Sequence, residues 1–167
     1  MPPGNEEDFA LAQRSAAGDT TAFALLVEKH ERPLRAFLER LAGADGDDLA
    51  QQAFLKAWRS AGQYDGRARF STWLTRIAWR CRLDQLRRRQ PEPVEPPVAV
   101  DHHRPLEVAD LLARLGERER AALILCEGHG WTHGEAATLL AIPLGTLKST
   151  IARAKRQCRQ VWEASDD

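Results

Sequence analysis

Apolar residues recur three or four positions apart along most of the chain, as in amphipathic helices, and no segment alternates strictly as a half-buried strand would. The strongest stripe predicts a helix over residues 20–41, which Pro33 should bend. Its apolar positions are Phe23, Leu26, Val27, His30, Leu34, Phe37, Leu38 and Leu41. Further helices are predicted over residues 6–17, 47–61, 71–89, 106–115 and 117–127. The pattern predicts an all-α protein.

A pair of helices is predicted near the end of the chain. Thr132 and Glu135 have the spacing of a capping box, and a second helix is predicted over residues 144–159, directly after Pro143. The predicted buried stripe of this second helix is Leu147, Ile151, Ala154 and Cys158. The residues expected on its other faces are Lys148, Ser149, Thr150, Arg153 and Arg156. This pattern is typical of a helix-turn-helix, whose second helix can enter the major groove of DNA.

The prolines divide the chain. Five of them fall within residues 91–105, and no regular helix can run through this segment because each proline removes an amide donor and restricts the residue before it. We therefore predict two small helical domains, residues 6–90 and 106–163, joined by an extended Pro-rich linker over residues 91–105.

The formal net charge is zero, but the charges are segregated. Residues 1–50 carry five bases and ten acids, whereas residues 56–89 carry ten bases and two acids. The helix predicted over residues 144–159 carries five bases and no acid. Cationic segments attract phosphate backbones through counterion release, so these two segments are the candidates for nucleic-acid binding.

Nothing in the sequence indicates export, a membrane span or a cofactor. The first 20 residues lack a secretory signal pattern, and no window approaches 18 consecutive apolar residues. Cys81, Cys126 and Cys158 fall within helical patterns without CxxC spacing, as expected of reduced thiols in a cytoplasmic protein. Cys126, His129 and His133 are residue types that bind metal, but structural zinc takes four ligands and no fourth is nearby, so no metal is expected.

Four motifs carry a resemblance to a known family. Residues 47–58 (DDLAQQAFLKAW), 70–78 (FSTWLTRIA) and 83–89 (LDQLRRR) resemble region 2 of the extracytoplasmic-function (ECF) sigma factors, in the sigma-70 family. Residues 143–149 (PLGTLKS) resemble the recognition helix of region 4 in the same family. The motifs stand in the family's order and spacing, and the resemblance covers about residues 9–89 and 106–160.

The resemblance implies a transcription initiation factor that binds core RNA polymerase, through the beta-prime clamp helices and the beta flap, and directs it to promoter DNA. The residues it implies for polymerase binding are Asp48, Gln51, Gln52 and Lys56. Those it implies for the melted minus-ten strand are Arg67, Arg69, Phe70, Trp73, Arg76 and Arg80. Those it implies for the minus-35 duplex are Thr146, Lys148, Ser149, Arg153, Lys155 and Arg156. It also implies inhibition by an anti-sigma factor.

Other interpretations remain open at this point. Phe70 and Trp73 are also candidates for the hydrophobic core, and the linker is as well explained by a simple tether as by a segment that threads the polymerase channels. A stand-alone helix-turn-helix regulator is the alternative function, but it leaves the first 90 residues without a role. An enzyme with a Cys and His pair is not expected, because the sequence has no Gly-rich phosphate loop and no paired acidic motif.

Overall fold

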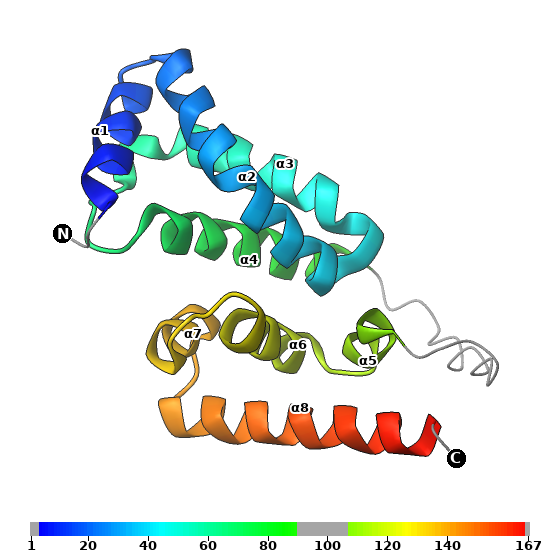
Figure 1. Cartoon of the computed structure of the whole chain (residues 1–167). Helices are drawn as coiled ribbons and strands as arrows, with labels where there is room; N and C mark the ends of the chain where they lie inside the picture. The colour runs from blue at the N-terminus through cyan, green and yellow to red at the C-terminus, as the bar shows by residue number, and fades with distance from the viewer. Residues whose placement is uncertain (1–3, 90–106, 166–167) are drawn as a thin grey trace. The chain divides into compact units, whose positions relative to one another are not determined.

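The computed structural model describes residues 4–89 and 107–165, and the chain divides into two compact units, Met1–Arg88 and Arg89–Asp167 (Figure 1). Every regular element among these described residues is a helix, which confirms the predicted all-α class. The predicted linker, residues 91–105, lies outside them. None of the helices within the two described ranges is both long and apolar enough to cross a lipid bilayer.

The first unit contains four helices: α1 (Asn5–Ala16), α2 (Thr20–Ala42), α3 (Gly46–Arg59) and α4 (Phe70–Arg88). Two short 3-10 turns, η1 (Gly43–Asp45) and η2 (Ala61–Gln63), flank α3. Helix α2 packs on α1 and α3, and α3 packs on α4. All four helices begin and end within two residues of the predicted positions, because the apolar stripes and the breaks between them are well marked.

Helix α2 supplies the centre of this core. Five positions of its predicted stripe, Leu26, Leu34, Phe37, Leu38 and Leu41, are at most 4% exposed. Phe23, Val27 and His30 are partly exposed instead, and the helix continues across Pro33 without a break. At its start, the Asp19 carboxylate accepts a hydrogen bond from the Ala22 amide at 3.0 Å, and this bond holds the pKa of Asp19 below its ordinary value.

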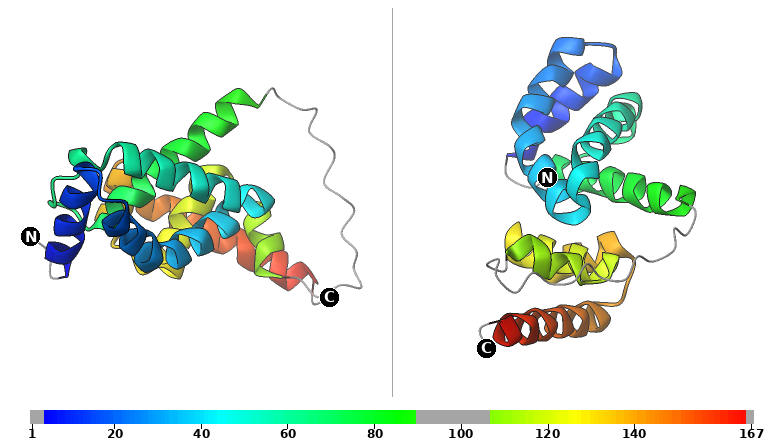
Figure 2. Two further views of the ribbon diagram at one scale, coloured as in Figure 1. Left: turned by 90° about the horizontal axis from the view of Figure 1, so that it is seen from above. Right: turned by 90° about the vertical axis from the view of Figure 1, so that its right-hand side faces the viewer.

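The second unit contains α5 (Val108–Ala113), α6 (Glu117–Leu123), α7 (His133–Leu140) and α8 (Leu144–Ser165). Helix α8 runs along α5, α6 and α7 and contacts all three (Figures 1 and 2). The helix predicted over residues 117–127 is wrong at its end, because α6 gives way to a π-helical turn, η3 (Ile124–Gly128). The His129 amide donates to the Ile124 carbonyl at 3.1 Å, five residues back, which widens the last turn. Gly130 then reverses the chain at φ 66°.

The turn between α7 and α8 has a left-handed residue that is not glycine. Ala141 ends α7 at φ 53°, and the amide of Ile142 donates to the Ala137 carbonyl at 3.1 Å. The Ala141 amide also donates to the Thr138 carbonyl at 3.3 Å, and the two bonds together form a Schellman motif. Pro143 follows and cannot continue α7. These bonds define the angle at which α8 leaves the turn.

Candidate nucleic-acid and polymerase interfaces

The predicted capping box at the start of α7 is present. The Thr132 hydroxyl accepts a hydrogen bond from the Glu135 amide at 3.2 Å, and the Glu135 carboxylate accepts one from the Thr132 amide at 2.9 Å. Helix α7 buries Ala136, Ala137, Leu139 and Leu140. Helices α7 and α8 therefore form the expected helix-turn-helix, and α6 packs against both of them.

Helix α8 buries one side and exposes a cationic one. Leu147, Ile151 and Ala154 are at most 5% exposed, as the predicted stripe requires, while Cys158 is half-buried. Thr150 was expected on another face but is 7% exposed, because it lies beside Leu147 and Ile151 on the buried side. The outer face of α8 consists of Thr146, Lys148, Ser149, Arg153, Lys155, Arg156 and Arg159, all of which are exposed. The first six are the residues predicted for the minus-35 duplex. Arg159, which lies one turn beyond Arg156, was not among them.

Two cations of this outer face are paired within the second unit. The Arg153 guanidinium contacts the Glu119 carboxylate through two nitrogens, at 2.6 and 2.7 Å, and the Lys155 ammonium contacts Glu127 at 2.7 Å. Within the described part of the chain, Lys148 and Arg156 form no ion pair. The pair with Glu119 therefore restricts the direction of the Arg153 side chain, whereas Lys148 and Arg156 are available for new contacts.

The second cationic region lies on the first unit, around the start of α4. We call residues 64–69, between η2 and α4, the basic loop. The Arg67 side chain is 90% exposed and its Nε lies 3.5 Å from an Asp65 carboxylate oxygen. Arg69 and Arg80 are exposed, and Arg76 is partly exposed. Four of the six residues predicted for the minus-ten strand thus present cationic groups to solvent.

The two aromatic residues predicted for the minus-ten strand lie differently. The Phe70 ring is 1% exposed and packs with Tyr64 and Trp73, at centroid distances of 5.3 and 5.4 Å. Trp73 is half-buried and its ring also lies 5.3 Å from that of Tyr64. The structure therefore gives Phe70 a place in the core instead of on the surface, because three aromatic rings bury one another there. Of the two residues, Trp73 is the one that remains partly exposed.

Helix α3 presents the third candidate surface. It buries Leu49, Ala50, Ala53, Phe54 and Ala57, and it exposes the four residues predicted for polymerase binding, Asp48, Gln51, Gln52 and Lys56. The Gln52 amide donates to the Asp48 carboxylate at 2.7 Å. Leu55, which is 49% exposed at the centre of this polar face, was not among the predicted residues. Helical spacing was the available signal, since Leu55 follows Gln51 by four residues and Gln52 by three.

The chemistry of an enzyme or a metal site is not visible in these regions. Burial raises the pKa of all three thiols, Cys81, Cys126 and Cys158, which disfavours the reactive thiolate. Among the residues that the structure describes, no three His, Cys, Asp or Glu side chains gather as metal ligands would. Cys126, His129 and His133, which are all described residues, form no such group.

Comparisons with known proteins agree with these surfaces. Residues 26–92 match the profile of sigma-70 region 2 and residues 106–158 match that of sigma-70 region 4. The chain is 36% identical to the ECF RNA polymerase sigma factor SigM of Mycobacterium tuberculosis, over 89% of this chain and 81% of SigM. It is 30% identical to the RNA polymerase sigma-H factor of Pseudomonas aeruginosa, over 90% of this chain and 91% of that protein.

Two solved structures have the same fold. CnrH, in complex with the cytosolic domain of CnrY, matches with a TM-score of 0.70 at 24% identity and covers 95% of this chain and 98% of its own. The sigma factor RpoE from Bartonella quintana, in complex with the anti-sigma factor NepR, matches with a TM-score of 0.71 at 23% identity and covers 84% of this chain and 96% of its own. The chain belongs to the sigma-70 family of RNA polymerase sigma factors. Within it, the SigM relatives of two Mycobacterium tuberculosis strains, at 36% and 37% identity, are named ECF RNA polymerase sigma factors.

Proposed function

We propose that this chain is an initiation factor that binds core RNA polymerase and directs it to promoters through three separate surfaces. The outer face of α8 reads the minus-35 duplex, the basic loop and α4 hold the melted minus-ten strand, and α3 binds polymerase. The observation that carries the proposal is the presence of both sigma regions, each with an exposed surface suited to its own partner. A stand-alone regulator would need only the helix-turn-helix.

On the minus-35 duplex, Lys148, Ser149 and Arg153 contact base edges, while Thr146, Lys155 and Arg156 contact phosphates. Long cationic side chains can donate to guanine O6 and N7, and a good bidentate contact contributes about 1 to 3 kcal/mol of discrimination. The exposure of all six side chains supports this assignment. Arg159 extends the phosphate-binding row by one turn.

On the minus-ten strand, Arg67, Arg69, Arg76 and Arg80 follow the phosphates, and the partly exposed ring of Trp73 stacks on a base. Single-stranded DNA is commonly held by cations along its backbone together with aromatic rings that accept unstacked bases. The burial of Phe70 favours an indirect role, in which its ring packs against that of Trp73 and holds it in place.

For polymerase binding, we propose that Leu55 is the apolar centre of a polar patch made by Asp48, Gln51, Gln52 and Lys56. An exposed leucine surrounded by polar residues is a common arrangement at protein interfaces, where a few buried apolar side chains contribute most of the affinity. The patch on α3 binds the beta-prime clamp helices of core polymerase, and the second unit binds the beta flap. The half-exposed Leu55 side chain supports this proposal.

An anti-sigma factor regulates the protein in this proposal. CnrH and RpoE were each solved in a complex, RpoE with the anti-sigma factor NepR and CnrH with the cytosolic domain of CnrY. We infer that a comparable partner covers the polymerase and DNA surfaces of this chain. The protein acts in the cytoplasm, where core polymerase and chromosomal DNA are found, and it performs no catalysis itself.

The test is run-off transcription with bacterial core polymerase and DNA from upstream of the chain's own gene. We expect a transcript that depends on the protein and is weakened by Lys148→Ala and by Leu55→Ala. Arg40→Ala, which removes an exposed cation from α2, is the control and should transcribe normally. A transcript of equal strength without the protein, or with both variants, would contradict the proposal.

A further inference from the structure

The basic loop is held from the far end of the sequence by one buried amide. Asn5, the first residue of α1, is 2% exposed. A buried amide has two hydrogens to donate and an oxygen that accepts twice, and leaving these unsatisfied is unfavourable. The partners of Asn5 therefore indicate what it is there to hold.

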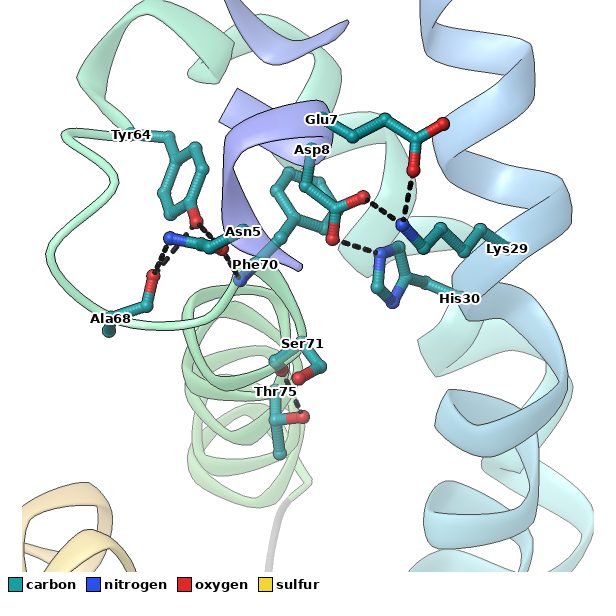
Figure 3. A network of polar contacts seen from close by, with 10 residues as sticks. All are labelled: Asn5, Glu7, Asp8, Lys29, His30, Tyr64, Ala68, Phe70, Ser71 and Thr75. Atoms are coloured by element: carbon teal, nitrogen blue, oxygen red, sulfur yellow. Dashed lines mark hydrogen bonds and ion pairs between the residues drawn. The ribbon is translucent and has the colours of Figure 1, made fainter. Parts of the chain in front are cut away.

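Within the described part of the chain, the Asn5 side chain forms four hydrogen bonds, all to residues 64–70. Figure 3 shows those to Tyr64, Ala68 and Phe70. Its Nδ2 donates to the carbonyls of Gly66 at 2.7 Å and Ala68 at 3.0 Å. Its Oδ1 accepts from the Tyr64 hydroxyl at 2.5 Å and from the Phe70 amide at 3.2 Å. One side chain thus bonds the first residue of the basic loop, two of the loop's carbonyls and the first amide of α4.

Helix α1 is itself fixed to α2 by a second polar cluster. The Asp8 carboxylate contacts the Lys29 ammonium at 2.7 Å and the His30 ring at 2.9 Å, and Figure 3 shows this cluster beside Asn5. The side chains of Asp8 and His30 are 7% and 11% exposed, so their contact is shielded from solvent, whereas the Lys29 side chain is 42% exposed. Asn5 is therefore carried by a helix that cannot shift freely.

The backbone of the basic loop is tied down while its cations are not. The Arg67 side chain is 90% exposed, and Arg69 is exposed next to the bonded Ala68 carbonyl. Gly66, bonded to Asn5, has φ 73°, a conformation that few other residues adopt. The amide thus fixes where the two arginines leave the backbone without contacting them.

We propose that Asn5 is a positioning residue, which holds the basic loop in the conformation that presents Arg67 and Arg69 to the melted minus-ten strand. This inference rests on the proposed function of that loop. A loop ordered before binding does not lose its freedom when DNA arrives, so preorganisation strengthens binding without adding a contact.

The experiment uses holoenzyme assembled from the full chain and core polymerase. Its probe is a fluorescent single-stranded oligonucleotide with the non-template minus-ten sequence of a promoter mapped by run-off transcription. Affinity is measured against salt concentration for Asn5→Ala, Tyr64→Phe and the double variant Arg67→Ala with Arg69→Ala. Ser15→Ala is the matched control, because Ser15 is a buried polar residue of α1, 3% exposed, whose hydroxyl donates to the Leu11 carbonyl of the same helix.

We expect Asn5→Ala to bind the oligonucleotide about tenfold more weakly, with an unchanged slope of affinity against salt, because no cation is lost. Tyr64→Phe should weaken binding less and in the same way. The double arginine variant should also lower the slope, by about 0.7 for each lost phosphate contact. Ser15→Ala should bind normally, and all four should bind core polymerase as the parent does.

Two results would overturn the inference. If Asn5→Ala and Tyr64→Phe bind the oligonucleotide as tightly as the parent while the double arginine variant is defective, Asn5 has only a structural role. If the double arginine variant binds normally with an unchanged slope, the proposed function of the basic loop is wrong, and the inference fails with it.

Discussion

A leucine pair on α8 allows the energetic basis of the helix-turn-helix to be tested. Leu147 is 0% exposed in the stripe that faces the other helices of its unit, whereas Leu144, three residues earlier on the same helix, is 46% exposed. Truncation of a fully buried leucine costs about 3 kcal/mol or more, through lost burial and the cavity left behind. Leu144→Ala removes the same atoms from a solvated site and should cost less than about 1 kcal/mol.

The size of the second unit decides what this loss means. Its described residues, 107–165, number about 60, and domains have about 0.05 to 0.15 kcal/mol of stability per residue, so the unit has about 3 to 9 kcal/mol in total. Leu147→Ala therefore removes a third or more of its stability. A loss of about 3 kcal/mol corresponds to a hundredfold or greater increase in opening, since about 1.4 kcal/mol is a factor of ten.

The assay is native-state hydrogen exchange measured on peptides by mass spectrometry. Amides of α7 and α8 should exchange about a hundredfold faster in Leu147→Ala than in the parent, and about thirtyfold or more faster than in Leu144→Ala. Those of α1 to α4 should be unchanged, because the two compact units have separate cores. Minus-35 recognition by the holoenzyme should weaken only in Leu147→Ala. Equal exchange in the two variants would refute the reasoning, as would equal acceleration in α1 to α4.

Three further predictions concern backbone packing, pH and DNA discrimination. Gly46→Ala should destabilise the first unit by about 1 to 3 kcal/mol in urea unfolding, because the added Cβ would lie 2.8 Å from a backbone nitrogen of α2. Gly62→Ala, whose added Cβ would lie 3.5 Å from its nearest neighbour, should be nearly neutral. Equal effects of the two substitutions would contradict this prediction. Burial lowers the pKa of His30 below 6.5, so its contribution to stability is complete above pH 6.5 and declines as the pH falls toward the folded-state pKa. Urea unfolding at decreasing pH should show this loss of stability in the parent and a smaller loss in His30→Gln. A parent that becomes more stable as the pH falls below 6.5 would contradict the prediction. Glu119→Gln should remove the ion pair that directs the Arg153 side chain, so the holoenzyme should discriminate less between promoters with different minus-35 sequences in competition transcription. Unchanged discrimination would show that the pair does not orient Arg153.

The sequence predicted the elements well where the signal was local. The stripe of α2, the capping box formed by Thr132 and Glu135, and the proline after α7 each depend on residues a few positions apart. The end of α6 was missed because a π-helical turn has no simple sequence pattern. Thr150 was misplaced because a polar residue on the edge of an apolar stripe can face either way, and packing against the other helices decides the outcome.

The details of the surfaces depend on contacts that no periodicity reveals. The burial of Phe70 involves, besides Tyr64 and Trp73 nearby in the sequence, the ring of His30 on α2, whose centroid lies 5.0 Å from that of Phe70 although the two residues are far apart in the chain. The bonds from Asn5 to residues 66 and 70 join positions more than 60 residues apart in the sequence. Leu55 was the exception, since helical spacing alone places it among the polar residues of α3.

The measurement that tests the central claim most directly is permanganate and DNase footprinting of one promoter fragment, with the protein alone, with core polymerase alone and with both. The account predicts protection of the minus-35 duplex and reactive thymines in the minus-ten element only when both are present. Protection of the duplex by the protein alone, with no change and no reactive thymines when polymerase is added, would contradict it and indicate a stand-alone regulator.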